Sequence, residues 1–260
     1  MALAGSGPVS IMCWNGPVSI TFGLAGLACA AFLLYVGHRA VAYPGKPIVT
    51  IFGRPVVYTK ATAWHAMFVA NIACVEMCEF LIWHAGPKPL ASAGTQDTCD
   101  PLNAVGTYGV FIFGFVNWMW IVSLWAYMSS NEGNDKQTFQ LYLVLGVVTS
   151  IGYIIKIGLG DVFQLDMDFW GAETRWSYDP NVSVVTCSFQ ETGRYPHLHW
   201  RFNMSPQAWL PSGFAWFAVG LMPLFFYKPR GTAAVVSAYG ALTYVIPKVF
   251  LPPEETMSMY

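Results

Sequence analysis

Three side chains that can bind protons lie inside one long apolar stretch of the sequence, which runs from about Trp64 to its outer end at His84. They are His65, Glu76 and Glu79. At about 100° per residue of an α-helix, Glu76 lies about 20° from His65 around the axis, and Glu79 about 40° from it on the other side. Because charge is costly in hydrocarbon, this stripe is expected to face other helices or a wet cavity. It is the first candidate for a proton or solute site.

Two polar residues in other apolar stretches are candidate partners of this stripe. Lys156 could pair with Glu79 or Glu76, and one carboxyl would then stay protonated because two close carboxylates resist joint ionisation. Asn117 could add a neutral hydrogen bond. Two alternatives stay open. Lys156 lies about one turn from Asp161 and could form a local boundary pair, and the polar group could be a structural clasp.

A second set of candidate residues lies in the long segment from 161 to 207. His197 and His199 would share one face of a strand, and Asp166 with Asp168 repeats that spacing. A catalytic zinc site needs about three ligands in fixed geometry, together with groups that orient them, and spacing alone establishes neither. Packing of the loop onto the helix ends is therefore the favoured interpretation. A metal site with enzyme activity is the alternative.

Aromatic side chains are concentrated between residues 103 and 128, where they could stack on a pigment, a quinone or a lipid tail. Aromatic-rich helices more often pack against one another or anchor at the membrane interface. A bound lipid or pigment is therefore a secondary hypothesis. The sequence contains no Gly-rich phosphate loop and no His-Glu-x-x-His, Gly-x-Ser-x-Gly or heme-attachment motif.

The composition places these groups in a membrane protein. Of 260 residues, 55% are hydrophobic, 16% aromatic and only 10% charged, against about 25% charged in soluble domains. So few charges cannot cover a water-facing surface. A net charge of −1 offers no cationic face for nucleic acid. Membrane lipids, membrane-protein partners or a second copy of the chain are the expected partners.

Six apolar runs are long enough to cross about 30 Å of hydrocarbon, which needs roughly 20 helical residues. We therefore predict an all-α, polytopic transmembrane helix bundle with about six spans. It forms a single domain over residues 18–260, after an N-terminal tail of residues 1–17. The segment 161–207 is expected to fold over one end as an outer cap. The runs are Val18–Gly37, Trp64–His84, Asn103–Met128, Phe139–Leu159, Trp209–Tyr227 and Thr232–Leu251.

The basic residues predict which side the loops face. The loops 39–60, 129–138 and 228–231 are rich in Lys and Arg, so they are expected to face the cytoplasm or its equivalent. Both termini then face the outer or lumenal side. Cys99 and Cys187 share that side, where an oxidising compartment would let them form a disulfide. The alternative is two unpaired thiols, because a shared side does not establish the geometry of the bond.

The stretch Met12-Cys13-Trp14-Asn15-Gly16-Pro17-Val18-Ser19 resembles the start of a poorly characterised family of small polytopic membrane proteins, found in bacteria, microbial eukaryotes and large viruses. That family typically opens Met-Cys-Trp-Ser, with another serine a few residues on. Three later segments are also similar to it. Val75–Glu79 resembles its Met-Glu segment, Cys99–Tyr108 its Cys, Asn and Thr-Tyr element, and Cys187–Trp200 its Cys-Ser and Gly-x-x-His-x-x-Trp stretch.

The resemblance implies a polytopic helical fold but no particular reaction. This sequence departs from the family pattern at Asn15, where the family has serine, and at Glu79, where a neutral polar residue is more usual. A mechanism that needs both carboxylates is therefore not implied by the resemblance. The residues that it singles out from their neighbours are Glu76, Cys99, Cys187 and His197.

Three functions remain open at the level of the sequence. The favoured one is transport of a small solute or proton through a polar intramembrane site centred on Glu76, Glu79 and His65. The second is a non-catalytic subunit of a larger membrane assembly that binds lipid or pigment. The third is a membrane enzyme whose metal site uses His197 and His199 in the outer cap.

Overall fold

The computed structural model describes residues 15–43, 49–51, 54–56, 61–88, 99–130, 135–163, 186–190, 198–202 and 216–227. This part of the chain is predominantly helical. It contains four helical segments that are long and apolar enough to cross a membrane. The protein is therefore an integral membrane protein by the length and composition of its helices. The four segments are Gly16–Arg39, Trp64–Ala85, Pro101–Met128 and Lys136–Gly158.

The first helix, α1 (Gly16–Ala42), begins at a side-chain cap. Asn15 Oδ1 accepts a hydrogen bond from the backbone N–H of Val18 at 3.0 Å, which satisfies a donor that the helix itself leaves unpaired. At the other end, the Arg39 guanidinium lies 4.7 Å from the centre of the Tyr43 ring. Asparagine is one of the residue types that cap helices best, so Asn15 fixes the start of α1.

The second helix, α2 (Ala61–Ala85), runs antiparallel to α1 and ends at a glycine. Gly86 has a φ of +71°, the left-handed conformation that often terminates a helix and that glycine adopts without strain. Between α1 and α2 the short strands β1 (Val49–Ile51) and β2 (Arg54–Val56) form an antiparallel hairpin.

The third crossing is continuous but contains a π-helical turn. It consists of α3 (Pro101–Val110), the π-helix η2 (Phe111–Val116) and α4 (Asn117–Ser129). Asp100 caps its start by accepting the backbone N–H of Leu102 at 2.8 Å. A π-helical turn inside an α-helix changes the direction in which backbone and side-chain groups point. The sequence pattern, which predicts an uninterrupted helix, does not indicate this turn.

The remaining described elements are one long helix, a second hairpin and a short helical segment. The helix is α5 (Lys136–Phe163). Strands β3 (Cys187–Gln190) and β4 (Leu198–Arg201) pair antiparallel, with Cys187 opposite Arg201. The short segment consists of the π-helix η3 (Trp216–Leu221) and α7 (Met222–Phe226).

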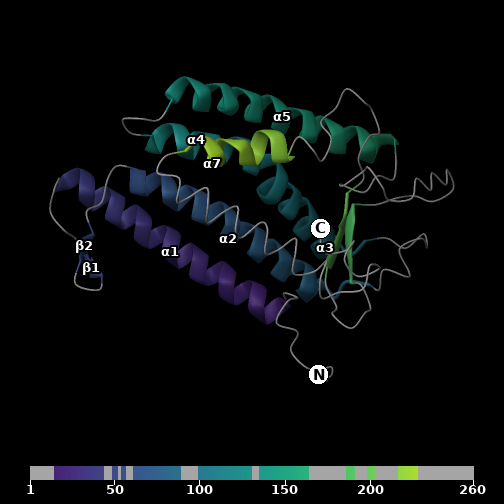
Figure 1. Cartoon of the computed structure of the whole chain (residues 1–260). Coiled ribbons are helices and arrows are strands. Elements are labelled where there is room, and N and C mark those ends of the chain that lie inside the picture. The colour runs from purple at the N-terminus through teal and green to yellow at the C-terminus, as the bar shows by residue number, and fades with distance from the viewer. Residues whose placement is uncertain are drawn as a thin grey trace, which may run out of the picture.

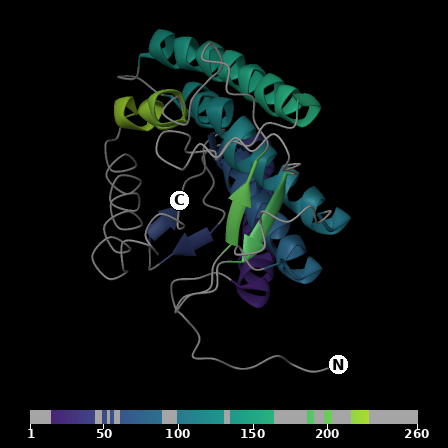
Figure 2. The same ribbon diagram turned by 90° about the vertical axis from the view of Figure 1, so that its right-hand side faces the viewer.

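The helices form two groups that the third crossing connects. Helices α1 and α2 pack together, α4, α5 and α7 form the other group, and α3 descends from α4 to the end of α2 (Figure 1). The β3–β4 hairpin lies at the end where α1 begins, α2 ends and α3 begins (Figures 1 and 2). The β1–β2 hairpin lies at the opposite end. Cys99 and Cys187 therefore lie at the same end of the bundle, as the alternation of crossings predicts.

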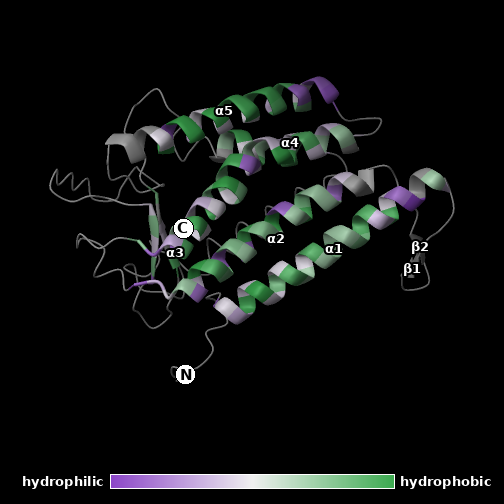
Figure 3. Ribbon diagram, turned by 180° about the vertical axis from the view of Figure 1, so that it is seen from behind, coloured by the Kyte–Doolittle hydropathy of each residue, from purple (hydrophilic) through white to green (hydrophobic). Residues whose placement is uncertain are grey.

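Apolar side chains fill the interior and also cover the outside of the bundle. Phe111, Phe115 and Tyr153 are buried in one core cluster, and Trp125 and Phe139 are buried in another. The hydropathy colouring shows apolar residues along nearly the full length of α1 and α5 (Figure 3). Large exposed apolar side chains on these two helices would be unfavourable in water and are suited to acyl chains. They include Phe22, Phe32, Leu34, Val144, Val148 and Ile151.

The first four predicted spans are present, each extending beyond its predicted bounds. Residues 16–17, assigned above to the tail, belong to α1, and residues 161–163, assigned above to the cap, belong to α5. The first correction arises because Asn15 caps the helix and proline suits its first turn. The second lies close to the usual spread in where a helix ends. Of the predicted fifth span only residues 216–227 are described, and the sixth falls outside the described residues. The bundle of six spans and the complete cap therefore remain predictions.

The acidic cap of α5 predicts a local pH dependence. Asp135 accepts hydrogen bonds from the Thr138 hydroxyl and from the backbone N–H of Gln137 at 3.0 Å. The Thr138 hydroxyl in particular lowers the pKa of the carboxyl, as the helix backbone donors also do. A depressed pKa stabilises the fold above the ordinary pKa of about 4, and this contribution is lost as the pH falls through the lower, folded-state pKa. Hydrogen exchange in the first turn of α5 should therefore accelerate in acid.

The matched variant for this prediction is Asp135→Asn, which keeps a capping oxygen but cannot ionise. Its first-turn exchange, corrected for intrinsic chemistry, should not change over the same acid range. An unaltered acid dependence in the variant would show that Asp135 is not the group responsible.

Candidate functional site

Helices α1 and α2 approach each other closely along a line of small residues. A Cβ atom added at Gly26 would lie 2.8 Å from the Cβ of Ala73. One added at Gly23 would lie 2.7 Å from the Sδ of Met77. Small residues of this kind let two helix backbones come into contact within a membrane. Ser19 lies on the same helix, one turn before Gly23, and is completely buried.

The buried Ser19 hydroxyl meets the more enclosed of the two acidic groups of α2. Its Oγ donates a hydrogen bond to Glu79 Oε2 at 3.2 Å, and Glu79 is only 8% exposed. Glu76, about one turn earlier, is half-buried, and its Oε2 has no hydrogen-bond partner among the described residues. The two carboxyl groups are close enough to interact electrostatically. Within the same part of the chain, neither has a basic side chain among its partners.

Aromatic side chains lie between these carboxyl groups and the hairpin end of the bundle. Phe80 and Trp83 each follow a glutamate by four residues, so they lie one turn closer to the end of α2. Both aromatic side chains lie against the first turn of α1, within 4 Å of a Cβ atom added at Gly16. Trp83 makes the closer contact, because a Cβ atom added at Gly16 would lie 3.2 Å from the Cβ of Trp83. The site is therefore covered on this side.

His65 does not join the two carboxyl groups. Its ring is exposed at the other end of α2 and makes an edge contact with Trp125, with 5.5 Å between ring centres. Eleven residues separate it from Glu76, which corresponds to about 16 Å along the helix axis. The sequence predicts one stripe for these groups, but His65 contacts α4 whereas Glu79 bonds to α1, and the helical rise separates them. Glu79 lies six residues from the end of α2, and so nearer the hairpin end than the middle.

Asn117 binds a different polar residue, at the π-helical turn. Its Nδ2 donates to Asn71 Oδ1 at 3.3 Å, and the Asn71 Nδ2 donates to the backbone carbonyl of Phe113 at 2.8 Å. From the other side, the Ser150 hydroxyl of α5 donates to the carbonyl of Val116 at 2.6 Å. Side chains from α2 and α5 therefore satisfy two carbonyls of η2. Hydrogen bonds from two neighbouring helices therefore stabilise the π-helical turn.

Lys156 lies in the other helix group. It is buried on α5, which packs mainly against α4 and η2, whereas Glu79 bonds to α1. The described contacts therefore place Lys156 and the carboxyl pair in separate surroundings. The side chain of Asp161, the alternative partner, lies outside the described residues.

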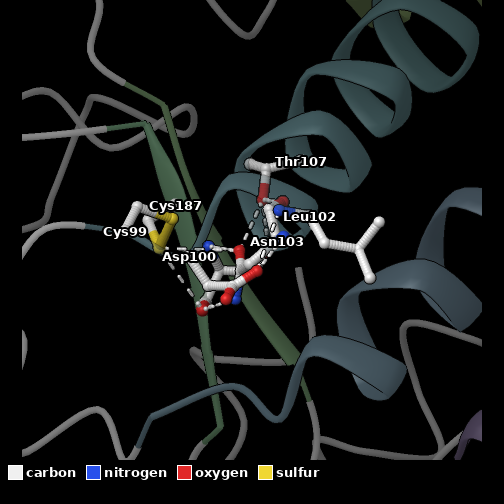
Figure 4. Close-up of a disulfide and its surroundings, with 7 residues drawn as sticks. Cys99, Asp100, Leu102, Asn103, Thr107 and Cys187 are labelled. Carbon is white, nitrogen blue, oxygen red and sulfur yellow. Dashed lines mark hydrogen bonds between the residues drawn. A yellow bond between two sulfur atoms is a disulfide. The ribbon is translucent and has the colours of Figure 1, made fainter.

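A buried polar junction attaches the β3–β4 hairpin to α3. The Asn103 side chain donates to the Ser188 carbonyl at 2.9 Å and accepts the Ser188 backbone N–H at 2.8 Å. Its side-chain amide therefore makes with Ser188 the pair of hydrogen bonds that the backbone of a neighbouring strand would make. The Thr107 and Ser188 hydroxyls lie 2.7 Å apart, and all three residues are buried. Asn103 fills the space between the strand and the first turns of α3 (Figure 4).

A disulfide lies beside this junction. Cys99 and Cys187 are bonded, with Cα atoms 5.8 Å apart, as the prediction of a disulfide requires (Figure 4). The hairpin makes two further attachments. The backbone N–H of Gln190 donates to the Lys88 carbonyl at 2.8 Å, and Phe202, directly after β4, packs on Phe111 and Phe115 of η2. The hairpin is thus fastened covalently, by hydrogen bonds and by apolar contact.

Most of the predicted metal ligands lie outside the residues that the structure describes. Asp166, Asp168 and His197 lie in segments that the structure does not describe, and only the backbone of His199 is placed, in β4. Among the described residues, no group of three or more His, Cys, Asp or Glu side chains could hold a metal ion. The metal site therefore stays an untested hypothesis.

Two residues of the polar contacts were not identified as site residues from the sequence. Ser19 and Asn71 are small polar side chains in apolar runs, where such residues usually bond to another helix. That signal was available, but it does not identify the partner. Comparisons of this chain with protein-family models, with curated proteins and with solved structures found no match.

Proposed function

We propose that this protein transports protons, or a small solute together with protons, and that Glu76 and Glu79 form the proton-binding site. The observation that supports this most is the enclosed Glu79 carboxyl. It lies in a membrane-spanning helix beside a second carboxyl and a hydroxyl, and within the described residues it has no basic partner.

The chemistry of such a pair favours reversible proton binding. Two ionised carboxylates in a poorly solvating environment repel each other, and this repulsion is removed when the pair binds a proton. A purely structural contact could be made by neutral side chains at lower cost in free energy. Two carboxyls on α2 are therefore better explained by a proton that enters and leaves.

The proposed orientation places the hairpin end on the outer or lumenal side. A disulfide is stable in an oxidising compartment. Arg39 and Lys136 lie at the opposite end, which suits the cytoplasmic side. Glu79 is nearer the hairpin end, so in this orientation the site lies in the outer or lumenal half of α2.

Proton flux into liposomes tests this proposal. The full chain is reconstituted, a pH gradient is imposed, and an enclosed pH-sensitive dye reports proton entry. We expect Glu79→Gln to reduce the flux to that of empty liposomes, because glutamine accepts the Ser19 hydrogen bond but cannot exchange a proton. Glu76→Gln should also reduce it strongly.

The matched control is Asp135→Asn, which neutralises an exposed carboxyl at the other end of the bundle. Its flux should equal that of the unmodified protein. A Glu79→Gln protein that folds normally and retains full flux would overturn the proposed function.

A further inference from the structure

Within the described residues, the oxygen groups shown to interact at the carboxyl pair are one hydroxyl and two carboxyls, fewer than a hard cation usually takes. Hard cations usually take about six or more oxygen ligands. The described side chains that interact within this site are Ser19, Glu76 and Glu79. A proton needs only one acceptor and no coordination shell. The number of oxygen groups therefore favours a proton over a metal ion.

The packing around the site also leaves little freedom for a hydrated ion. On one side Gly23 is in contact distance of Met77, and on the other Gly16 is in contact distance of Trp83. Ser19 lies between these two contacts on α1 and is completely buried. Admitting an ion with its water would require α1 and α2 to separate along a seam of close contacts.

We propose, resting on the proposed function above, that Glu76 and Glu79 together hold a single proton to the exclusion of sodium and potassium, and that Ser19 is the positioning residue of the site. Its hydroxyl hydrogen bond supports the negative charge that remains on the pair. The proton belongs to the pair rather than to either residue, since coupled groups titrate together.

Labelling with dicyclohexylcarbodiimide tests this proposal on the full chain in detergent micelles. The reagent modifies protonated carboxyl groups in apolar surroundings, and mass spectrometry of the α2 peptide counts the labels. We expect one label per chain at neutral pH and faster labelling as the pH falls. Replacing choline chloride by sodium or potassium chloride should not change the rate. Two labels per chain, no label, or protection by either cation would overturn the proposal.

Ser19→Ala tests the positioning role. Loss of a hydrogen bond to a charged group should raise the ratio of protonated to ionised pairs by about fivefold or more, and labelling at neutral pH should accelerate accordingly. The control is Thr21→Ala on the same helix, whose exposed hydroxyl bonds to the carbonyl of Pro17. Its pH profile should match that of the unmodified protein. If Ser19→Ala also leaves the profile unchanged, Ser19 does not position the pair.

The labelling experiment tests what the site binds and the flux experiment tests what the site does, so either proposal can be overturned without the other. Cation protection combined with loss of flux in Glu79→Gln would leave a transport site but replace its occupant. A single cation-insensitive label combined with full flux in Glu79→Gln would leave a proton-binding pair and overturn its role in transport.

Discussion

Gly146→Ala is expected to reduce the free energy of unfolding by about 1–3 kcal/mol. A Cβ atom at this position would overlap the carbonyl oxygen of Met119 and lie 2.8 Å from its carbonyl carbon and 3.0 Å from the Cα of Trp120. All three atoms belong to the backbone of α4, so no side-chain rotation can relieve the overlap. The helices α4 and α5 would have to separate. Thermal unfolding in detergent, followed by circular dichroism, measures the effect.

Gly158→Ala is the matched control on the same helix. No described residue lies within 4 Å of a Cβ atom added there, and alanine favours a helix over glycine by up to about 1 kcal/mol. This variant should be as stable as the unmodified protein or slightly more stable. Equal loss of stability in both variants would mean that the two glycines are needed for a reason other than the α4–α5 contact.

The second large effect is expected for Asn103→Leu. Leucine has a similar size but no hydrogen-bonding group, so both the N–H and the carbonyl of Ser188 would lose their partner in a buried place. Each such loss costs about 1–3 kcal/mol. The disulfide would still tether the hairpin, so the primary change should be local. We expect Asn103→Leu to accelerate hydrogen exchange at Ser188, relative to the unmodified protein, by a factor at least as large as in the middle of α2.

Thr107→Val at the same junction provides the comparison. It removes one hydroxyl contact with Ser188 but keeps the paired bonds to Asn103. Its effect should be clearly smaller than that of Asn103→Leu. The importance assigned to the Asn103 amide would be refuted if the two variants exchanged at the same rate.

The junction and the carboxyl pair lie close together through α2 and α3. A Cβ atom at Gly106 of α3 would lie 2.6 Å from Ile82 Cγ1 and 2.9 Å from the backbone carbonyl oxygen of Cys78. Cys78 directly precedes Glu79. The hairpin thus holds α3, α3 packs on α2, and α2 carries the site. Segments far apart in the sequence therefore meet at one end of the bundle.

The amino-acid sequence by itself determined that this is a membrane protein and where its first four crossings lie. Run length and the scarcity of charge are local properties, and a bilayer of nearly constant thickness converts them directly into helices. The alternation of crossings also brought Cys99 and Cys187 to one end. The sequence also identified Glu79 as a residue that must be sheltered, because an exposed carboxylate is too costly in hydrocarbon.

Only the tertiary structure decided which groups meet. A helical pattern gives the angle of a side chain around its own axis, but not the neighbour that it faces or the depth at which they meet. Glu79 therefore bonds to Ser19, Asn117 bonds to Asn71, and His65 lies apart. The π-helical turn of the third crossing likewise depends on donors from α2 and α5. These pairings depend on how whole helices pack, which no single segment of the sequence encodes.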